Sequence, residues 1–445
     1  MRESFDLLVR GGTVATPNGI ALADVGVIGG RIAAIGSLSG AKAAEVFEAK
    51  GLHVLPGVMD TQVHFREPGN AHKEDLASGS LAAILGGVTS VFEMPNTVPP
   101  TTTRAAIEDK LARARGRMHC DHAFYVGATP QNIGALAELE QMPGVCGVKA
   151  FLGSSTGTLL LNKSEDILAM LKAGTRRVAV HSEDEDRMIA RKHLAERGKP
   201  QTHPVWRDAE AARMSTERVL GLAKKAGRRL HVLHITTGDE IPLLAAAKDF
   251  STAETTPQHL TLSAPECYER LGTYAQMNPP IREESHRLAL WEAVRNGVID
   301  VIGSDHAPHT REEKDKVYPD SPSGMPGVQT LATILLDHVN KGNLTLERFI
   351  DLTASSAQRI FGIAGKGRIA LGYDADFTIA DMNLTREIQN SWIASTCRWT
   401  PFDGMKTKGW PVATILRGRA VMRDFAATGA AAGHPVRFVD TLEPA

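Results

Sequence analysis

HVLPGVMDTQVHFREPGNAHKEDLASGSLAAILGGVTSVFEMPN, residues 53–96, contains one complete strand–loop–helix–strand unit. Residues 53–65 and 89–96 are apolar runs with β-branched residues, as is typical of strands. Residues 73–87 instead repeat their apolar positions with a helical period. A polar loop with glycine and proline lies between the first strand and the helix, so this stretch predicts a β/α unit.

The same pattern recurs along residues 53–345. Further strands are expected at residues 121–129, 144–152, 176–184, 228–236, 251–262 and 299–309, and helices at 103–117 and 283–297 among others. Eight such units in about 290 residues predict a (β/α)8 TIM-type barrel. A doubly wound open sheet is the alternative, but no GxGxxG follows the first strand, which disfavours a dinucleotide-binding fold.

The two ends of the chain differ from this central part. Residues 5–19 and 24–36, and later 367–381 and 410–424, alternate short apolar runs with glycine turns and have no helical period. Because short edge strands are rarely stable alone, we expect both ends to form one small β-sandwich. The predicted domains are residues 1–52 and 366–445 for the β-sandwich and tail, and 53–365 for the hydrolase barrel.

Composition restricts the function further. The 445 residues carry a formal net charge of -1, which disfavours nucleic-acid binding. The four cysteines are scattered without CxxC spacing, as in a reducing compartment. The N-terminus has no apolar signal core, and no apolar run reaches membrane-spanning length. We therefore expect a cytoplasmic enzyme that acts on a small molecule, away from membranes.

Polar and metal-ligating residues collect where the predicted strands end, the end at which TIM barrels build active sites. Residues 62, 64 and 66 alternate by two, so their side chains should share one face of the strand. Imidazoles suit zinc, and a carboxylate completes such a site. The full set is Asp60, Gln62, His64, Arg66, Asn96, Lys149, His181, His234, Asp305, His306 and His309.

Lys149 is unusual because it lies inside an apolar strand, where burying an ammonium group is costly. Next to divalent cations its amine should be neutral, and a neutral amine can add carbon dioxide to form a carbamate. The two carbamate oxygens suffice to bridge metals about 3.5–4 Å apart. A lysine that snorkels to the surface or forms an ion pair is the alternative.

These motifs carry a family resemblance. PGVMDTQVHFREPG, MPNTVPP, GVKAF, HSEDE, HVLHITT, TPQHLTL, MNPPIR, GSDHAPHTREEK and the tail TPFDGMKTKGWPVATILRGRAVM occur in order over nearly the whole chain. Together they resemble the dihydroorotases of the amidohydrolase superfamily. The resemblance implies reversible conversion of dihydroorotate into N-carbamoyl-aspartate, in which a metal-bound hydroxide attacks the carbonyl of the cyclic amide. One or two divalent metal ions are expected, with zinc the expected ion.

The resemblance also implies residue roles. His64 and Asp305 would hold the more buried metal, His181 and His234 the second, and the Lys149 carbamate would bridge them. Asp305 would also shuttle the proton. The substrate carboxylate would be held by Arg66, Asn96 and His309, and the ring would contact Asn278. Supporting or packing roles are expected for Asp60, Glu183, His231 and His306.

Gln62 departs from the family, which usually has two histidines as an HxH pair on the first strand. A neutral amide is a poorer zinc ligand than imidazole, so Gln62 should be a weak or absent ligand. Some related proteins that lost ligands are non-catalytic scaffolds, for example as partners of aspartate transcarbamoylase. Allantoinase or dihydropyrimidinase activity is the closer alternative, although neither substrate carries the ring carboxylate. We also expect a homo-oligomer.

Overall fold

The computed structural model describes residues 4–155 and 157–442. Among these residues, eight parallel strands form one sheet whose spatial order follows the sequence. The strands are β6 (Val58–Val63), β7 (Val88–Glu93), β8 (Asp121–Gly127), β9 (Val145–Phe151), β10 (Val178–His181), β11 (Leu230–Val232), β12 (Ser251–Thr255) and β13 (Val301–Ile302). A bridge between Val63 and His306 joins the last segment to the first, so the predicted TIM-type barrel is confirmed as a nearly closed one.

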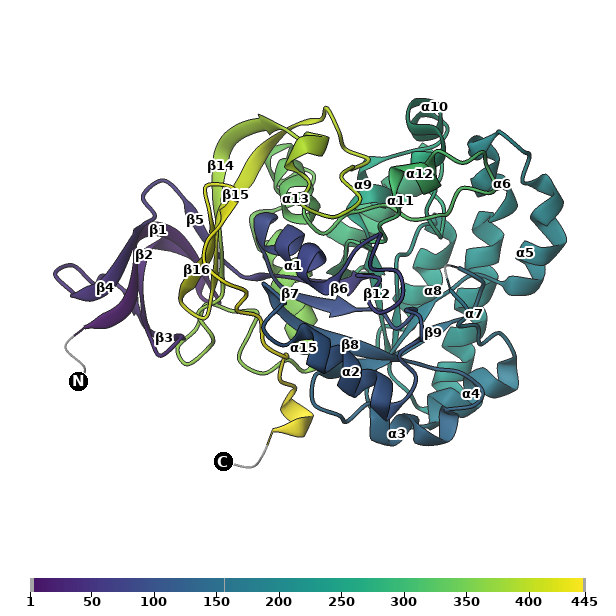
Figure 1. Ribbon diagram of the computed structural model, residues 1–445, viewed down its shortest axis with the longest axis horizontal. Helices are drawn as coiled ribbons and strands as arrows, with labels where there is room; N and C mark the ends of the chain where they lie inside the picture. Colours follow the sequence, from purple (N-terminus) through teal and green to yellow (C-terminus); the bar gives the residue numbers. More distant parts are fainter. Residues whose placement is uncertain (1–3, 156, 443–445) are drawn as a thin grey trace.

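Helices lie between successive strands and surround the barrel (Figure 1). Residues of β7, β8 and β9 are buried along their whole length, as expected for parallel strands covered on both faces. The helices are α1 (Leu76–Leu85), α2 (Arg104–Ala114), α3 (Leu136–Leu139), α4 (Ser164–Lys172), α5 (Glu185–Arg191), α6 (His203–Trp206), α7 (Ala209–Ala226), α8 (Ile241–Ala246), α9 (Pro257–Thr261), α10 (Glu266–Leu271), α11 (Glu284–Arg295), α12 (Arg311–Lys314), α13 (Leu331–Asn340), α14 (Leu346–Ile350) and α15 (Ser356–Phe361).

Local sequence explains where these helices begin and end. Asp75 caps α1 by accepting a hydrogen bond from the Ser78 backbone N–H, and the Ser78 hydroxyl oxygen accepts one from the Asp75 backbone N–H. Asp208 caps α7 in the same position, and Gly227 ends that helix in a left-handed conformation with φ 66°. None of the helices in the described ranges is long and apolar enough to cross a membrane.

The two ends of the chain form a separate mixed sheet. Its order is β17–β16–β15–β14–β5–β1–β2–β3, with β4 beside β1. The strands are β1 (Phe5–Thr16), β2 (Gly19–Ile28), β3 (Arg31–Gly36), β4 (Ala43–Glu48), β5 (His53–Pro56), β14 (Phe377–Glu387), β15 (Lys406–Leu416), β16 (Arg419–Arg423) and β17 (Ala426–Ala427). Pairing of β5 with β1 and β14 joins the two ends, and the sheet stands at one side of the barrel (Figure 1).

Three predicted strands end differently in the structure. Residues 53–65 divide at Gly57 into β5, which joins the mixed sheet, and β6, which joins the barrel. A Cβ at Gly57 would lie 2.3 Å from the Thr89 hydroxyl, so this close approach requires glycine. Residues 251–262 change from strand to helix at Pro257, which occupies the first turn of α9 after the Thr256 cap. Of residues 299–309, only Val301–Ile302 is strand, and the remainder is loop.

Candidate active site

The residues predicted for the site converge on one small cavity at the carboxyl ends of the barrel strands. Its volume is about 20 Å³. Phe151, Ser155, Ala307, Ser323 and Gly324 complete its wall. The predicted residues that line it are Gln62, His64, Arg66, Asn96, Lys149, His181, His234, Asn278 and Asp305. His309 is buried, but it lies behind Arg66 and does not line the cavity.

His64 and Asp305 form the first pair of metal-ligand candidates. His64 Nδ1 lies 2.7 Å from the Asn96 side-chain oxygen, and Nε2 lies 3.2 Å from Asp305 Oδ1. Both partners are acceptors, so the neutral ring donates to one of them, and donation to Asn96 would leave the Nε2 lone pair toward Asp305 for a metal shared by the two side chains. Burial lowers the pKa of His64, which keeps the ring neutral as a metal ligand requires.

His181 and His234 form the second pair. His181 Nε2 lies 2.9 Å from a Glu183 carboxylate oxygen and donates to it, so Nδ1 presents its lone pair toward His234 Nε2 at 3.0 Å. Burial lowers the pKa of both imidazoles. Burial also opposes ionisation of Glu183, but Arg207 and His181 together hold the pKa of this carboxyl well below its usual range. The anion orients His181.

Lys149 lines the same cavity as the two pairs. Its side chain is 1% exposed, and among the described residues its ammonium nitrogen has no hydrogen-bond partner. Burial lowers the pKa of Lys149 to about 7, so a large fraction is neutral amine near neutrality. An unpartnered amine in this position has the chemistry needed to add carbon dioxide.

Gln62 contacts the catalytic candidate Asp305. Its amide nitrogen donates to Asp305 Oδ1 at 2.9 Å, while within the described residues its buried amide oxygen has no hydrogen-bond partner. The side chain therefore holds the carboxylate through one end and leaves a neutral oxygen at the other. This arrangement leaves the predicted weak-ligand role of Gln62 untested.

The donor set fits a divalent metal only when Lys149 or Gln62 is included. In the ranges that the structure describes, no group of three or more His, Cys, Asp or Glu side chains is placed to hold a metal. The imidazole and carboxylate donors come instead as the two pairs above, each facing a partner at about hydrogen-bond distance. A carbamate on Lys149 would supply the missing donor to each pair.

Arg66 contributes a buried positive charge to the same cavity. Its side chain is 4% exposed and donates to the Pro308 carbonyl oxygen at 3.2 Å. Within residues 4–155 and 157–442, no carboxylate oxygen lies within 4 Å of the guanidinium. Burial lowers the pKa of Arg66 to about 10, so the group stays cationic at pH 7. Asp305 and three glutamates near the guanidinium raise its pKa from a distance, but none pairs with it directly, and a buried cation without a direct ion pair favours an anionic ligand.

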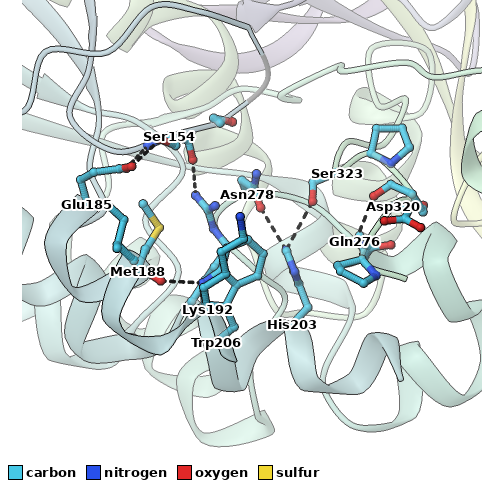
Figure 2. Close-up of a pocket in the computed structure, with 16 residues that line it drawn as sticks. Ser154, Glu185, Met188, Lys192, His203, Trp206, Gln276, Asn278, Asp320 and Ser323 are labelled. Carbon is cyan, nitrogen blue, oxygen red and sulfur yellow. Dashed lines mark hydrogen bonds between the residues drawn. The ribbon is translucent and has the colours of Figure 1, made fainter. Parts of the chain in front are cut away.

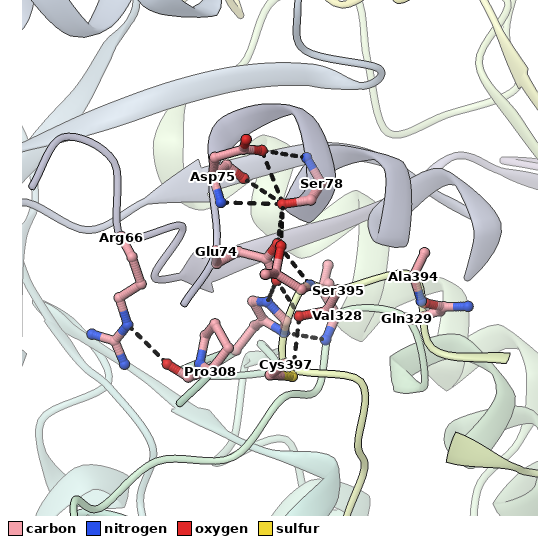
Figure 3. A network of polar contacts seen from close by, with 12 residues as sticks. Arg66, Glu74, Asp75, Ser78, Pro308, Val328, Gln329, Ala394, Ser395 and Cys397 are labelled. Atoms are coloured by element: carbon pink, nitrogen blue, oxygen red, sulfur yellow. Dashed lines mark hydrogen bonds and ion pairs between the residues drawn. The ribbon is translucent and has the colours of Figure 1, made fainter. Parts of the chain in front are cut away.

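A second network supports the loop after β13 (Figure 3). His306 Nδ1 accepts from the Gly327 backbone at 3.1 Å, so Nε2 carries the proton and donates to Glu74 at 3.3 Å. Buried Glu74 also accepts from the Ser395 hydroxyl. These bonds fix the residue after Asp305 to the segment before α1 and to the loop after β14. Sequence analysis assigned His306 a supporting role and did not identify Glu74.

A larger pocket of about 440 Å³ adjoins the small cavity (Figure 2). Ser155, Asn278 and Ser323 line both spaces. Trp206, Met188 and Lys192 form part of its outer wall, and buried His203 lies against Asn278. His203 and Arg207 were not identified from the sequence, although both belong to the HPVWRD stretch at residues 203–208.

Comparison with known proteins places the chain in a family. The amidohydrolase family model matches residues 178–421, and the dihydro-orotase-like model matches residues 51–240. The dihydroorotase of Halobacterium salinarum is 38% identical over 89% of this chain and 93% of its own. An allantoinase of Escherichia coli is 35% identical over 94% and 95%, respectively. The L-hydantoinase (dihydropyrimidinase) structure from Arthrobacter aurescens covers 97% of this chain and 99% of its own, with 30% identity and a TM-score of 0.92.

The chain therefore belongs to the amidohydrolase family, whose members generally use divalent metals. It is a cyclic amidohydrolase, as predicted from its motifs. The similar proteins include a dihydroorotase, an allantoinase and an L-hydantoinase, so similarity alone does not identify the cyclic substrate. The choice among these substrates has to be argued from the residues of the site.

Proposed function

We propose that this enzyme is a dihydroorotase that interconverts dihydroorotate and N-carbamoyl-aspartate in de novo pyrimidine synthesis. The observation that carries the proposal is Arg66, a buried cation in the reaction cavity without a carboxylate partner among the described residues. Dihydroorotate carries a ring carboxylate that would neutralise this charge through two parallel hydrogen bonds. Allantoin and simple hydantoins lack that group.

Neighbouring residues support the orientation of Arg66. His309 Nε2 lies 3.3 Å from an Arg66 guanidinium nitrogen and 3.1 Å from the Ser323 carbonyl oxygen, and Lys73 Nζ lies 3.2 Å from Nδ1 of the same ring. Burial lowers the pKa of His309 to about 3, so the ring is neutral. We propose that His309 supports Arg66 from behind and that Asn96, which lines the cavity, contacts the carboxylate directly.

Asp305 is positioned to move the proton. Its Oδ1 lies near both His64 Nε2 and the Gln62 amide nitrogen. In ring opening, this carboxylate would take a proton from the attacking water and deliver it to the ring nitrogen that leaves the carbonyl carbon. In the reverse direction it would remove the proton from the ureido nitrogen of N-carbamoyl-aspartate.

We propose that one or two divalent metal ions, zinc by the preference of imidazole donors, are held by the two pairs and by a carbamate on Lys149. When bound, such ions supply hydroxide at neutral pH and polarise the scissile carbonyl. The carbamate forms when the neutral Lys149 amine adds carbon dioxide and releases one proton. High-resolution density, or measured release of carbon dioxide on acidification, would test it. A free ammonium group in metal-replete protein would contradict it.

Turnover of dihydroorotate, by protein of measured metal content, tests the proposed function. Allantoin and hydantoin are the comparison substrates. A higher kcat/KM for dihydroorotate supports the proposal, and preference for an uncharged ring contradicts it. Absence of both turnover and metal would instead favour a scaffold that acts with a partner such as aspartate transcarbamoylase.

Allantoin or hydantoin hydrolysis is the second candidate. The pocket of about 440 Å³ beside the reaction cavity favours a hydantoin with a large ring substituent, which that space could hold; allantoin and hydantoin themselves are no larger than dihydroorotate. The similarity to an allantoinase and an L-hydantoinase points the same way. We rank this activity second because neither allantoin nor hydantoin carries a carboxylate that could pair with Arg66.

A further inference from the structure

His203 lies outside the reaction cavity, yet it contacts a residue that lines it. It begins α6 and is 1% exposed. Its ring packs edge-on against Trp206 and Tyr318, with centroids 5.8 Å away in each case. One ring nitrogen, Nε2, meets three oxygen atoms, from Met277, Asn278 and Ser323. The histidine thus joins α6 to the two loops that flank the cavity.

The hydrogen-bond partners determine which nitrogen of His203 carries the proton. The Met277 carbonyl oxygen lies 3.1 Å from Nε2, and a carbonyl oxygen only accepts. Nε2 must therefore be the N–H donor in the neutral ring. Among the described residues, the other nitrogen, Nδ1, is buried without a hydrogen-bond partner. Burial lowers the pKa of His203 to about 3, which keeps the ring neutral at any physiological pH.

The same argument fixes the Asn278 amide, whose two ends are otherwise hard to distinguish. Nε2 of His203 lies 3.0 Å from the Asn278 side chain, and an N–H group requires an acceptor there. The amide oxygen must therefore face His203, as Figure 2 shows. His203 lines only the outer pocket, whereas Asn278 lines both spaces. The amide nitrogen, a donor, is thereby left for the reaction cavity.

We propose that His203 is a positioning residue that holds the Asn278 amide with its nitrogen toward the reaction cavity, where it donates to a carbonyl oxygen of the substrate ring. The inference rests on the proposed function, because it requires a cyclic ureide in the cavity. Ring carbonyls are common to dihydroorotate, allantoin and hydantoin. The effect of His203 should therefore be the same for a charged and an uncharged ring.

Steady-state kinetics of three variants test this proposal. His203→Leu removes the donor, whereas His203→Gln places an amide N–H near the position of Nε2. Loss of one oriented hydrogen bond should raise KM about tenfold in His203→Leu, with kcat within about threefold. His203→Gln should stay near the parent. Asn278→Ala should raise KM by a similar factor, and the double variant His203→Leu/Asn278→Ala should lose nothing further.

A matched control separates positioning from packing. His338 is also buried, at 4% exposed, and its ring packs edge-on against Trp291, but it lines neither space. His338→Leu should lower the melting temperature without changing KM. An unchanged KM in His203→Leu, or additive losses in the double variant, would overturn the proposal.

A readout without substrate distinguishes failure of this inference from failure of the proposed function. With ¹⁵N-histidine labelling, the parent should show a neutral His203 ring protonated at Nε2 from pH 5 to 9, assigned by the signal missing in His203→Gln. That result supports the Asn278 orientation even if dihydroorotate is not turned over. A ring protonated at Nδ1, or a cationic ring, would overturn the inference while leaving the proposed function standing.

Discussion

Replacing Arg66 by methionine would remove a buried cation while keeping an apolar side chain of similar length in its place. Among the described residues no carboxylate pairs directly with Arg66, although Asp305 and three glutamates act on it from a distance, so the substrate carboxylate should supply its one direct ion pair. Truncating one member of a desolvated charge pair costs about 2–5 kcal/mol. At 1.36 kcal/mol per tenfold, kcat/KM for dihydroorotate should fall between about 30-fold and about 5000-fold.

The assay compares dihydroorotate with hydantoin for the parent, Arg66→Met and Arg66→Lys. Hydantoin turnover should change far less, since that ring lacks the carboxylate. Arg66→Lys keeps the positive charge but loses the planar guanidinium group, so its kcat/KM for dihydroorotate should lie between those of the parent and Arg66→Met. Metal content and melting temperature serve as controls, because Arg66 also donates to the Pro308 carbonyl oxygen. Equal kcat/KM for dihydroorotate in parent and Arg66→Met, with metal retained, would refute the carboxylate-binding role.

Four further outcomes are expected. Lys149→Ala should lower kcat by at least about 1000-fold through loss of bridging oxygens, and short carboxylic acids should restore part of it; no rescue, or near-parental activity, would count against a carbamate. Asp305→Asn should keep its fold and at least one metal yet lose about 10²–10⁴-fold in kcat, and turnover within a few-fold of the parent would eliminate it as proton shuttle. His203 and His309 have pKa values lowered to about 3, so below pH 6.5 the unfolded chain binds more protons than the folded one. The free energy of unfolding in urea should therefore fall between neutral pH and pH 5 by about 2 kcal/mol for each of these histidines, and the total fall should be smaller in His203→Gln. An equal fall in parent and variant would contradict this expectation. Gln62→His should raise metal retention against graded chelator, and equal retention would mean that Gln62 ligates well or does not matter.

The barrel was predictable from the sequence because the same strand-then-helix pattern recurs along the chain. Continuous apolar strands such as residues 145–151 are buried on both faces, and helical periods such as residues 283–297 lie between them. The mixed sheet was also predictable from the glycine turns at both ends. Pairing of β5 with β14 was not predictable, because residues 53–56 resemble the start of a barrel strand and their partners lie more than 300 positions further along the chain.

The candidate site was predictable where a side chain follows directly from a strand. His181 ends β10 and Lys149 lies within β9, so their direction follows from strand geometry. His203 could not be found in this way. It lies on a four-residue helix between β10 and β11, and its contacts with Met277 and Asn278 join positions more than 70 residues apart. The domain boundaries, the oligomeric state, the cytoplasmic location and the residue roles stay predictions.

Arg66 lines the cavity, but it reaches it by a geometry that strand alternation did not predict. Alternation along one strand predicted that residues 62, 64 and 66 share a face, but β6 ends at Val63. Arg66 instead reaches the cavity with a left-handed backbone, φ 58°, and His234 and Asp305 do so with φ 37° and 45°. Such conformations cost about 1–2 kcal/mol each outside glycine, and they persist only where surrounding contacts enforce them. At Asp305 those contacts are visible, since Glu74 and the Gly327 backbone clamp the adjacent His306. Three strained residues around one cavity indicate that side-chain direction there is maintained at the expense of local stability, as expected where a site must meet its ligand in one fixed geometry.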